Sequence, residues 1–104
     1  MYYTYMIRCT DNSIYTGITT NIERRMDEHK TKSKKCAKYT LLHSYDKVEK
    51  IWCSESRTDA SKLEYHIKKL PKSQKDELIK KEIYNIKYLC RKIDLERYRK
   101  YLKV

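Results

Sequence analysis

Two short runs near the start of the chain carry the β-branched and aromatic residues that are typical of strands. They cover residues 2–9 (YYTYMIRC) and 14–19 (IYTGIT), with the turn-forming segment TDNS between them, and they predict a β-hairpin. Because side chains alternate between the faces of a strand, Tyr5 and Tyr15 share a face only if the loop has an odd number of residues or a bulge. The loops DNS and CTDNS both satisfy this condition, and the longer one brings the two rings closer together.

A helix is predicted after the hairpin. The segment TNIE at 20–23 has the form of a capping box, with Thr20 as the N-cap. Arg25 and His29 stand four residues apart, so they lie on one side of this helix, beside its apolar stripe. From 30 to 38 lysines recur without any apolar periodicity, which predicts an exposed loop.

The middle of the chain predicts one further strand and two helices. Residues 48–55 (VEKIWCSE) alternate loosely between apolar and polar and hold the only tryptophan, so we expect a third strand there. A helix is expected from about Asp59 and should end by Pro71. The segment SQKD at 73–76 has the form of a cap for another helix.

The end of the chain is predicted to be helical and basic. Residues 82–89 (EIYNIKYL) fit both a helical period and strand alternation, and both remain open. Residues 95–104 predict a basic helical tail. The whole pattern predicts an α/β (α+β) fold, with a small three-stranded antiparallel sheet flanked by helices over residues 1–80. A basic helical C-terminal extension over residues 81–104 would pack on that domain or follow it.

The charge of the chain indicates its class of partner. Lys and Arg number 25 against 14 Asp and Glu, a net charge of +11, and there are eleven tyrosines and no phenylalanine. This excess attracts polyanions, either nucleic acid or an anionic membrane surface, and the tyrosines favour nucleic acid. No apolar run approaches the ~20 residues of a membrane helix, and Arg8 and Asp11 interrupt any signal peptide, so we expect a cytoplasmic protein without a membrane partner. The four cysteines form no CxxC pair, which argues against structural zinc.

Glu64 is the residue that fits its predicted surroundings least well. It lies at the edge of an apolar stripe on the helix from Asp59, and Lys62, Lys68 and Lys69 are expected to point elsewhere. A carboxylate in such a place is costly unless it is paired or binds a cation. A salt bridge to a buried arginine and a ligand for Mg²⁺ or Mn²⁺ are both consistent with this position.

Several motifs together resemble those of the GIY-YIG nucleases. The first family tripeptide corresponds to TYM at 4–6 and the second to YTG at 15–17. The segment YTGITTNIERRMDEH has the family's spacing from the second tyrosine to an arginine and a histidine, and ASKLEYHIKKL is similar to the helix that carries the family's metal-binding glutamate. The resemblance covers residues 1 to about 80 and is to the small, single-domain bacterial branch of UPF0213 proteins.

The resemblance implies a metal-dependent DNA endonuclease that hydrolyses phosphodiester bonds. It implies that Glu64 holds one divalent cation, Mg²⁺ or Mn²⁺, and that Gly17 lets the backbone pass close to a bound phosphate. No zinc-binding domain of the kind that some relatives carry is expected. The residues to which it assigns catalytic roles are Tyr5, Tyr15, Arg25, His29 and Glu64.

The lysine-rich loop is expected to bind the nucleic acid backbone, and a tyrosine beside it could stack on an unpaired base. A non-catalytic nucleic-acid-binding module with the same fold is the alternative, and the DNA partner could be double-stranded, branched or single-stranded. An RNA- or ribosome-associated protein would also fit the charge, but it leaves the tyrosine, arginine, histidine and glutamate pattern unexplained. The expected nucleic-acid-binding residues are Lys32, Lys34, Lys35, Lys38 and Tyr39.

Overall fold

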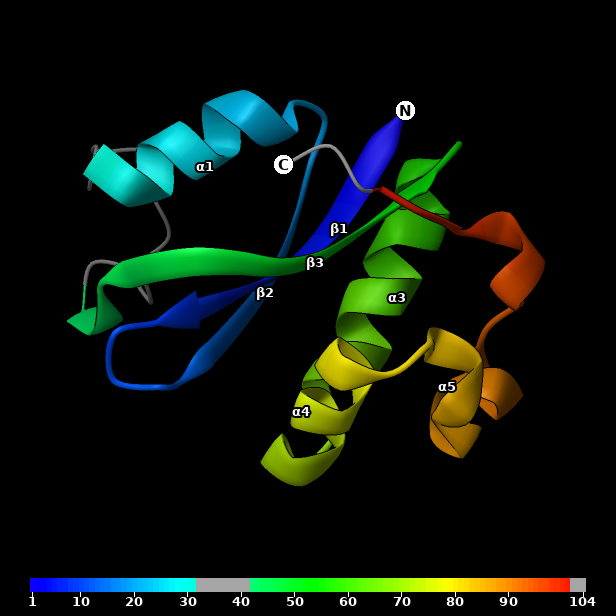
Figure 1. The fold of residues 1–104 in the computed structure, drawn as a ribbon. Coiled ribbons are helices and arrows are strands. Elements are labelled where there is room, and N and C mark those ends of the chain that lie inside the picture. The colour runs from blue at the N-terminus through cyan, green and yellow to red at the C-terminus, as the bar shows by residue number, and fades with distance from the viewer. Residues whose placement is uncertain (32–41, 102–104) are drawn as a thin grey trace.

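The computed structural model describes residues 1–31 and 42–101. Its centre is an antiparallel sheet with the strand order β2-β1-β3-β4. The strands are β1 (Tyr2–Cys9), β2 (Ile14–Thr19), β3 (Tyr45–Ser54) and β4 (Arg99–Lys100). The helices are α1 (Ile22–Thr31), α3 (Arg57–Lys68), α4 (Lys72–Lys80) and α5 (Lys87–Lys92), and α1 lies apart from the other three (Figure 1).

The hairpin has the predicted bounds and the predicted parity. Tyr5 lies opposite Gly17 and Ile7 lies opposite Tyr15, so the side chains of Tyr5 and Tyr15 point to the same face of the sheet. The last registered pair joins Arg8 to residue 14, which leaves CTDNS as the connection. The longer of the two candidate loops is therefore the one that forms.

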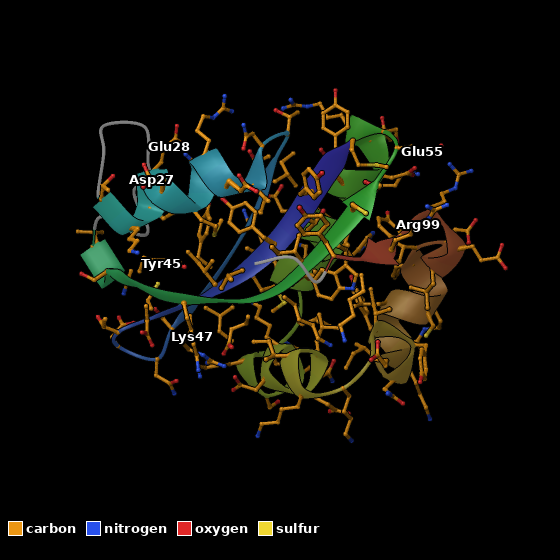
Figure 2. The ribbon with its side chains drawn as sticks, turned by 45° about the horizontal axis from the view of Figure 1, so that its top comes forward. Asp27, Glu28, Tyr45, Lys47, Glu55 and Arg99 are labelled. Carbon is orange, nitrogen blue, oxygen red and sulfur yellow. The ribbon has the colours of Figure 1, made fainter. Side chains whose placement is uncertain are left out.

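The sheet separates two apolar cores, because alternate side chains of β1 point to opposite faces. Tyr5 and Ile7 belong to the core beneath α1. Met6, between them in the sequence, packs with Trp52 of β3 and with apolar residues of α3, α4 and α5. Figure 2 shows side chains on both sides of the long strand β3, which runs from Tyr45 to just before Glu55. The α1 face is the one that carries the two tyrosines.

Three predicted helix starts are corrected by the structure. At α1 the cap is Asn21, whose side-chain oxygen accepts from the backbone N–H of Arg24 at 3.0 Å, and Thr20 does not cap; asparagine is the stronger N-cap of the two. α3 begins two residues before Asp59, because Ser56 accepts from the Asp59 backbone N–H at 3.0 Å. The segment 73–76 lies inside α4, whose N-cap makes no side-chain hydrogen bond.

The predicted helical tail is wrong. After α5 the chain forms a 3-10 turn, η2 (Leu95–Arg97), and then β4, which pairs with β3. The Tyr98 hydroxyl donates to the backbone oxygen of Asp59 at 2.6 Å, which ties this segment to α3. Pairing with the free edge of β3 and contact with the core override the local preference for helix.

The segment between α4 and α5 is neither one continuous helix nor a strand. It forms a 3-10 turn, η1 (Ile83–Asn85), followed directly by α5. Ile86, Leu89 and Ile93 are buried in the same core as Leu63 of α3. This part of residues 81–104 therefore packs on α3, through an apolar surface that the helical period of the sequence indicates.

Two predictions concern a membrane partner and the residues that bind nucleic acid. No helix within residues 1–31 and 42–101 is long and apolar enough to cross a membrane. The expected nucleic-acid-binding residues Lys32, Lys34, Lys35, Lys38 and Tyr39 lie outside the described residues, so their role stays a prediction.

Candidate active site

Tyr5 is the centre of a hydrogen-bonded cluster on the α1 face of the sheet. Its side chain is completely buried. The phenol oxygen lies 2.9 Å from Nε2 of His29, and Nε of Arg25 donates to the same oxygen at 3.3 Å. Burial raises the pKa of the Tyr5 phenol well above its usual value, so the hydroxyl is protonated at neutral pH. The predicted tyrosine, arginine and histidine therefore meet at one atom.

His29 is buried and neutral. Burial disfavours the charged imidazolium and Arg25 adds a like charge, so the pKa of His29 falls to about 4. At neutral pH its Nε2 can accept the proton of the Tyr5 hydroxyl, whose oxygen accepts from Arg25. The imidazole is thus a neutral hydrogen-bond acceptor for the Tyr5 phenol at neutral pH.

Arg25 is held in place by a residue that the sequence analysis did not assign to the site. Its terminal nitrogen donates to the carboxylate of Glu28 at 2.9 Å, and the same carboxylate lies 3.9 Å from Arg24. The Glu28 and Tyr5 contacts keep the pKa of Arg25 above its usual value despite partial burial. The i,i+3 spacing of Arg25 and Glu28 on a helix is the signal that could have identified this pair.

Tyr15 completes a group of three rings. Its ring centroid lies 6.2 Å from that of Tyr5 and 5.7 Å from that of His29. Tyr15 is half-buried, whereas Tyr5 and His29 have no exposed surface. Of the two phenols, Tyr15 is therefore the one that solvent can reach.

Gly17 leaves space for Tyr5. A Cβ at this position would lie 2.6 Å from the Tyr5 phenol oxygen and 3.0 Å from a ring carbon of Tyr15. The glycine does not have a positive φ, so conformational freedom is not the reason for its presence. The close approach of a phosphate to this backbone, which the resemblance implies, stays a prediction.

Glu64 reaches the cluster from α3. Its side chain is 24% exposed and is paired with Lys68, one helical turn later, at 3.3 Å. Its negative charge contributes to the raised pKa of Tyr5, and Nζ of Lys68 lies 5.7 Å from the centroid of the Tyr15 ring. Glu64 is thus paired with a lysine and not with a buried arginine. The expectation that Lys68 points away from Glu64 is wrong.

The donor set fits a hard cation rather than zinc. The described residues hold no cluster of three or more His, Cys, Asp or Glu that could bind a metal ion. A cation at Glu64 would therefore have fewer than three ligands of these types from this part of the chain. Mg²⁺ commonly takes one or two carboxylates and completes its shell with waters and phosphate oxygens, whereas structural zinc needs four protein ligands.

Comparisons with known proteins identify the family and the fold. Residues 1–78 match the family described as the GIY-YIG catalytic domain. A UPF0213 protein of Fusobacterium nucleatum is 45% identical over 80 residues, which cover 77% of this chain and 78% of that protein. A UPF0213 protein of Desulfotalea psychrophila is 40% identical over 79 residues, covering 76% of this chain and 71% of that protein.

A solved structure supports the fold. The solution NMR structure of the UPF0213 protein from Bacillus halodurans matches with a TM-score of 0.50 and 33% sequence identity, covering 77% of this chain and 84% of that chain. The predicted α+β fold, with an antiparallel sheet and flanking helices, is confirmed. With a family match over about three quarters of its length and relatives this similar, the chain belongs to the GIY-YIG catalytic-domain family.

Proposed function

We propose that this protein is a metal-dependent DNA endonuclease that hydrolyses phosphodiester bonds. Membership of the GIY-YIG catalytic-domain family supports nuclease chemistry in general. The observation that carries the proposal for this chain is the hydrogen-bonded cluster of Tyr5, His29 and Arg25, with Glu64 close enough to act on the Tyr5 phenol. A nucleic-acid-binding module without catalysis would need the positive charge but not a buried phenol bonded to a neutral imidazole.

Each residue has a role that follows from its surroundings. Arg25 bears a positive charge at neutral pH, and its guanidinium can stabilise the charge that develops on the phosphate in the transition state. Tyr15 is the accessible phenol and orients the attacking water by a hydrogen bond. Tyr5 is buried and positions Arg25 and His29. The water's oxygen forms the new bond to phosphorus and the bond to the 3′-oxygen breaks. The water's proton passes to solvent, and the leaving 3′-oxygen takes up a proton from solvent.

Glu64 is the residue that would hold the divalent cation, Mg²⁺ or Mn²⁺. When bound, such a cation supplies positive charge at the scissile phosphate and the leaving 3′-oxygen. The carboxylate has the exposure for this role, and its present partner Lys68 is an exposed side chain that can rotate away. An exposed ion pair of this kind contributes little to stability, so exchanging it costs little.

The test compares two carboxylates in the same helical arrangement. Glu64→Gln removes the proposed metal ligand, and Glu77→Gln removes a glutamate that pairs with Lys81 across one turn of α4 at 3.5 Å. We expect the wild-type protein and Glu77→Gln to nick supercoiled DNA with Mg²⁺ or Mn²⁺ and to stop when EDTA is added. Glu64→Gln should lose cleavage while it still binds DNA in EDTA.

A melting curve for each variant, with and without Mg²⁺, separates metal binding from folding. Mg²⁺ should raise the melting temperature of the wild type and of Glu77→Gln, but not that of Glu64→Gln, because a ligand that binds only the folded state stabilises it. If Glu64→Gln alone is destabilised and Mg²⁺ does not stabilise the wild type, Glu64 is a structural ion-pair residue and the proposal loses its metal site. A wild type that binds DNA but cleaves none would support the non-catalytic module instead.

A further inference from the structure

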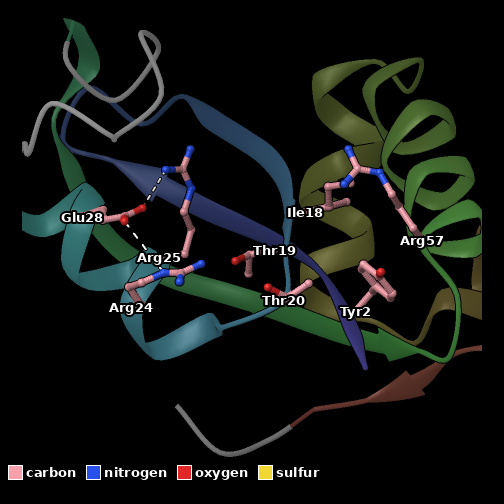
Figure 3. A pocket seen from close by; sticks show the side chains of 8 residues that line it. All are labelled: Tyr2, Ile18, Thr19, Thr20, Arg24, Arg25, Glu28 and Arg57. Atoms are coloured by element: carbon pink, nitrogen blue, oxygen red, sulfur yellow. Dashed lines mark hydrogen bonds and ion pairs between the residues drawn. The ribbon is translucent and has the colours of Figure 1, made fainter.

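A cavity of about 450 Å³ opens beside the tyrosine cluster. It runs from α1 to the start of α3 across the end of β2 (Figure 3). Arg25 belongs both to this cavity and to the cluster around Tyr5, so the two adjoin at this side chain. The lining residues that matter here are Tyr2, Ile18, Arg24, Arg25, Glu28 and Arg57.

The cavity is positively charged. Three arginines line it against one glutamate, an excess of two positive charges. Glu28 is shared between Arg24 and Arg25 (Figure 3), whereas the exposed Arg57 makes no ion pair within the described part of the chain. A concave site with unneutralised guanidinium groups favours an anion, and guanidinium matches the geometry of a phosphate.

Arg57 stands where helix stability would not place a cation. It is the first residue of α3, and the positive end of the helix dipole disfavours a positive side chain there. Arg57 precedes Glu64 by seven residues, so both lie on the same face of α3, about 10 Å apart along the helix axis. A residue that opposes a local preference without a structural partner is a candidate for function.

The end of the cavity next to Arg57 is less polar. Tyr2 and Ile18 are half-buried there, on the same side of the cavity as Arg57 (Figure 3). An aromatic ring and an aliphatic side chain can receive a base by stacking and apolar contact. A cavity of this volume is also within the range of small-ligand sites.

We propose that this cavity binds the nucleotide adjacent to the scissile phosphate, with Arg57 holding its backbone phosphate and Tyr2 and Ile18 contacting its base. This rests on the proposed function, since Arg25 marks the scissile position. The subsite makes the enzyme read the strand on one side of the cut and so fixes the direction in which the strand lies across the active site.

The test compares Arg57→Gln with Arg91→Gln, which removes the same charge from an exposed position on α5 that has no ion pair in the described regions. Affinity for a labelled single-stranded oligonucleotide and its duplex is measured by fluorescence anisotropy in EDTA, over a range of salt. Arg57→Gln should weaken binding about tenfold and flatten the salt dependence by ~0.7–0.9 in slope, whereas Arg91→Gln should change neither. The melting temperature of Arg57→Gln should be unchanged or slightly higher, because the substitution removes an unfavourable charge from the helix start.

A second arm locates the phosphate. The mapped cleavage substrate is remade with one neutral methylphosphonate at each position in turn, and wild type and Arg57→Gln are compared. In the wild type, one position beside the cut should slow cleavage about tenfold, and in Arg57→Gln that same position should have no further effect. Losses spread evenly over all positions would mean that Arg57 acts only through general attraction, which overturns the subsite.

The outcomes separate the two proposals. If the wild type cleaves DNA but Arg57→Gln behaves like Arg91→Gln, the subsite is wrong and the proposed function stands. If the wild type cleaves nothing, the proposed function fails, and the anisotropy comparison still decides whether the cavity binds a nucleotide. Equal DNA affinities for Arg57→Gln and Arg91→Gln overturn the subsite proposal, whether or not the wild type cleaves DNA.

Discussion

The substitution Gly17→Ala tests whether the Tyr5 phenol is as firmly placed as the structure indicates. Alanine normally stabilises a strand relative to glycine by ~0.5–1 kcal/mol, because it has less conformational freedom to lose. At position 17 the new Cβ would lie 2.6 Å from the Tyr5 oxygen and 2.8 Å from the ring carbon that carries it. The sign of the effect therefore depends on whether the Tyr5 ring can move.

The Tyr5 ring has little room to move. It is fully buried in the core beneath α1, and its oxygen is held by His29 at 2.9 Å and Arg25 at 3.3 Å. A shift of a few tenths of an ångström takes the Arg25 contact beyond hydrogen-bond range. Overpacking costs ~1–3 kcal/mol and a lost hydrogen bond costs about 1 kcal/mol, against the small gain from alanine. We expect Gly17→Ala to destabilise the protein by about 2 kcal/mol.

Urea unfolding of four proteins measures this cost and its cause: the wild type, Gly17→Ala, Tyr5→Phe and the double variant. Tyr5→Phe removes the nearest oxygen, so Gly17→Ala should cost about 1 kcal/mol less in that background. Nicking should fall in Gly17→Ala as well, because Arg25 loses its anchor. If Gly17→Ala has wild-type stability, or its cost is the same in both backgrounds, the ring is not fixed by this contact and the reasoning is wrong.

Three further predictions concern the charged groups of the site and its surroundings. Arg25→Ala should lower the nicking rate by ~10²–10³, which is the scale for removing one transition-state donor. Arg91→Ala should leave the rate unchanged, and equal rates for the two variants would exclude a role for Arg25 in the chemistry. The unfolded chain protonates His29 near its usual pKa of ~6.5 and the folded chain only at about 4, so stability should fall by up to about 3 kcal/mol as the pH drops through that window. Urea titrations of the wild type and His29→Gln at several pH values check this. If both proteins lose the same stability as the pH drops, groups other than His29 cause the loss. Replacing four lysines of the segment 32–41 by alanine should reduce the salt slope of DNA binding by ~0.7–0.9 per lost phosphate contact. An unchanged slope would show that these lysines make no phosphate contact. The lysines to replace are Lys32, Lys34, Lys35 and Lys38.

The hairpin and the tyrosine cluster could be predicted because their determinants are local. The parity of the loop decides which face each tyrosine takes, and CTDNS has the odd length that brings Tyr5 and Tyr15 together. The four-residue spacing of Arg25 and His29 then places both beside Tyr5 once α1 packs on that face. Helical periodicity singles out Glu64, and the resemblance to a family implies its metal-binding role. Periodicity alone did not indicate that Lys68 is its partner.

The parts that could not be predicted depend on contacts between distant segments. The strand β4 forms because the edge of β3 is available, and nothing in the tail itself favours a strand over a helix. Arg57 gives no signal in the sequence beyond an arginine near a helix start. Its place in the cavity depends on how α3 packs beside the end of β2, where Ile18 and Thr19 lie.

The two groups with the most direct proposed roles, Arg25 and Glu64, both have ion-pair partners within the protein, and this sets what a substrate must do. Glu28 is shared by Arg25 and Arg24, and Lys68 pairs with Glu64. A phosphate bound at Arg25 must compete with a carboxylate 2.9 Å away, and that competition subtracts from its net affinity. The unpaired charge at Arg57 has no such competitor. Binding energy gained at the cavity can therefore offset the cost of rearranging the ion pairs of Arg25 and Glu64. Cleavage then depends on a strand long enough to reach both Arg57 and Arg25.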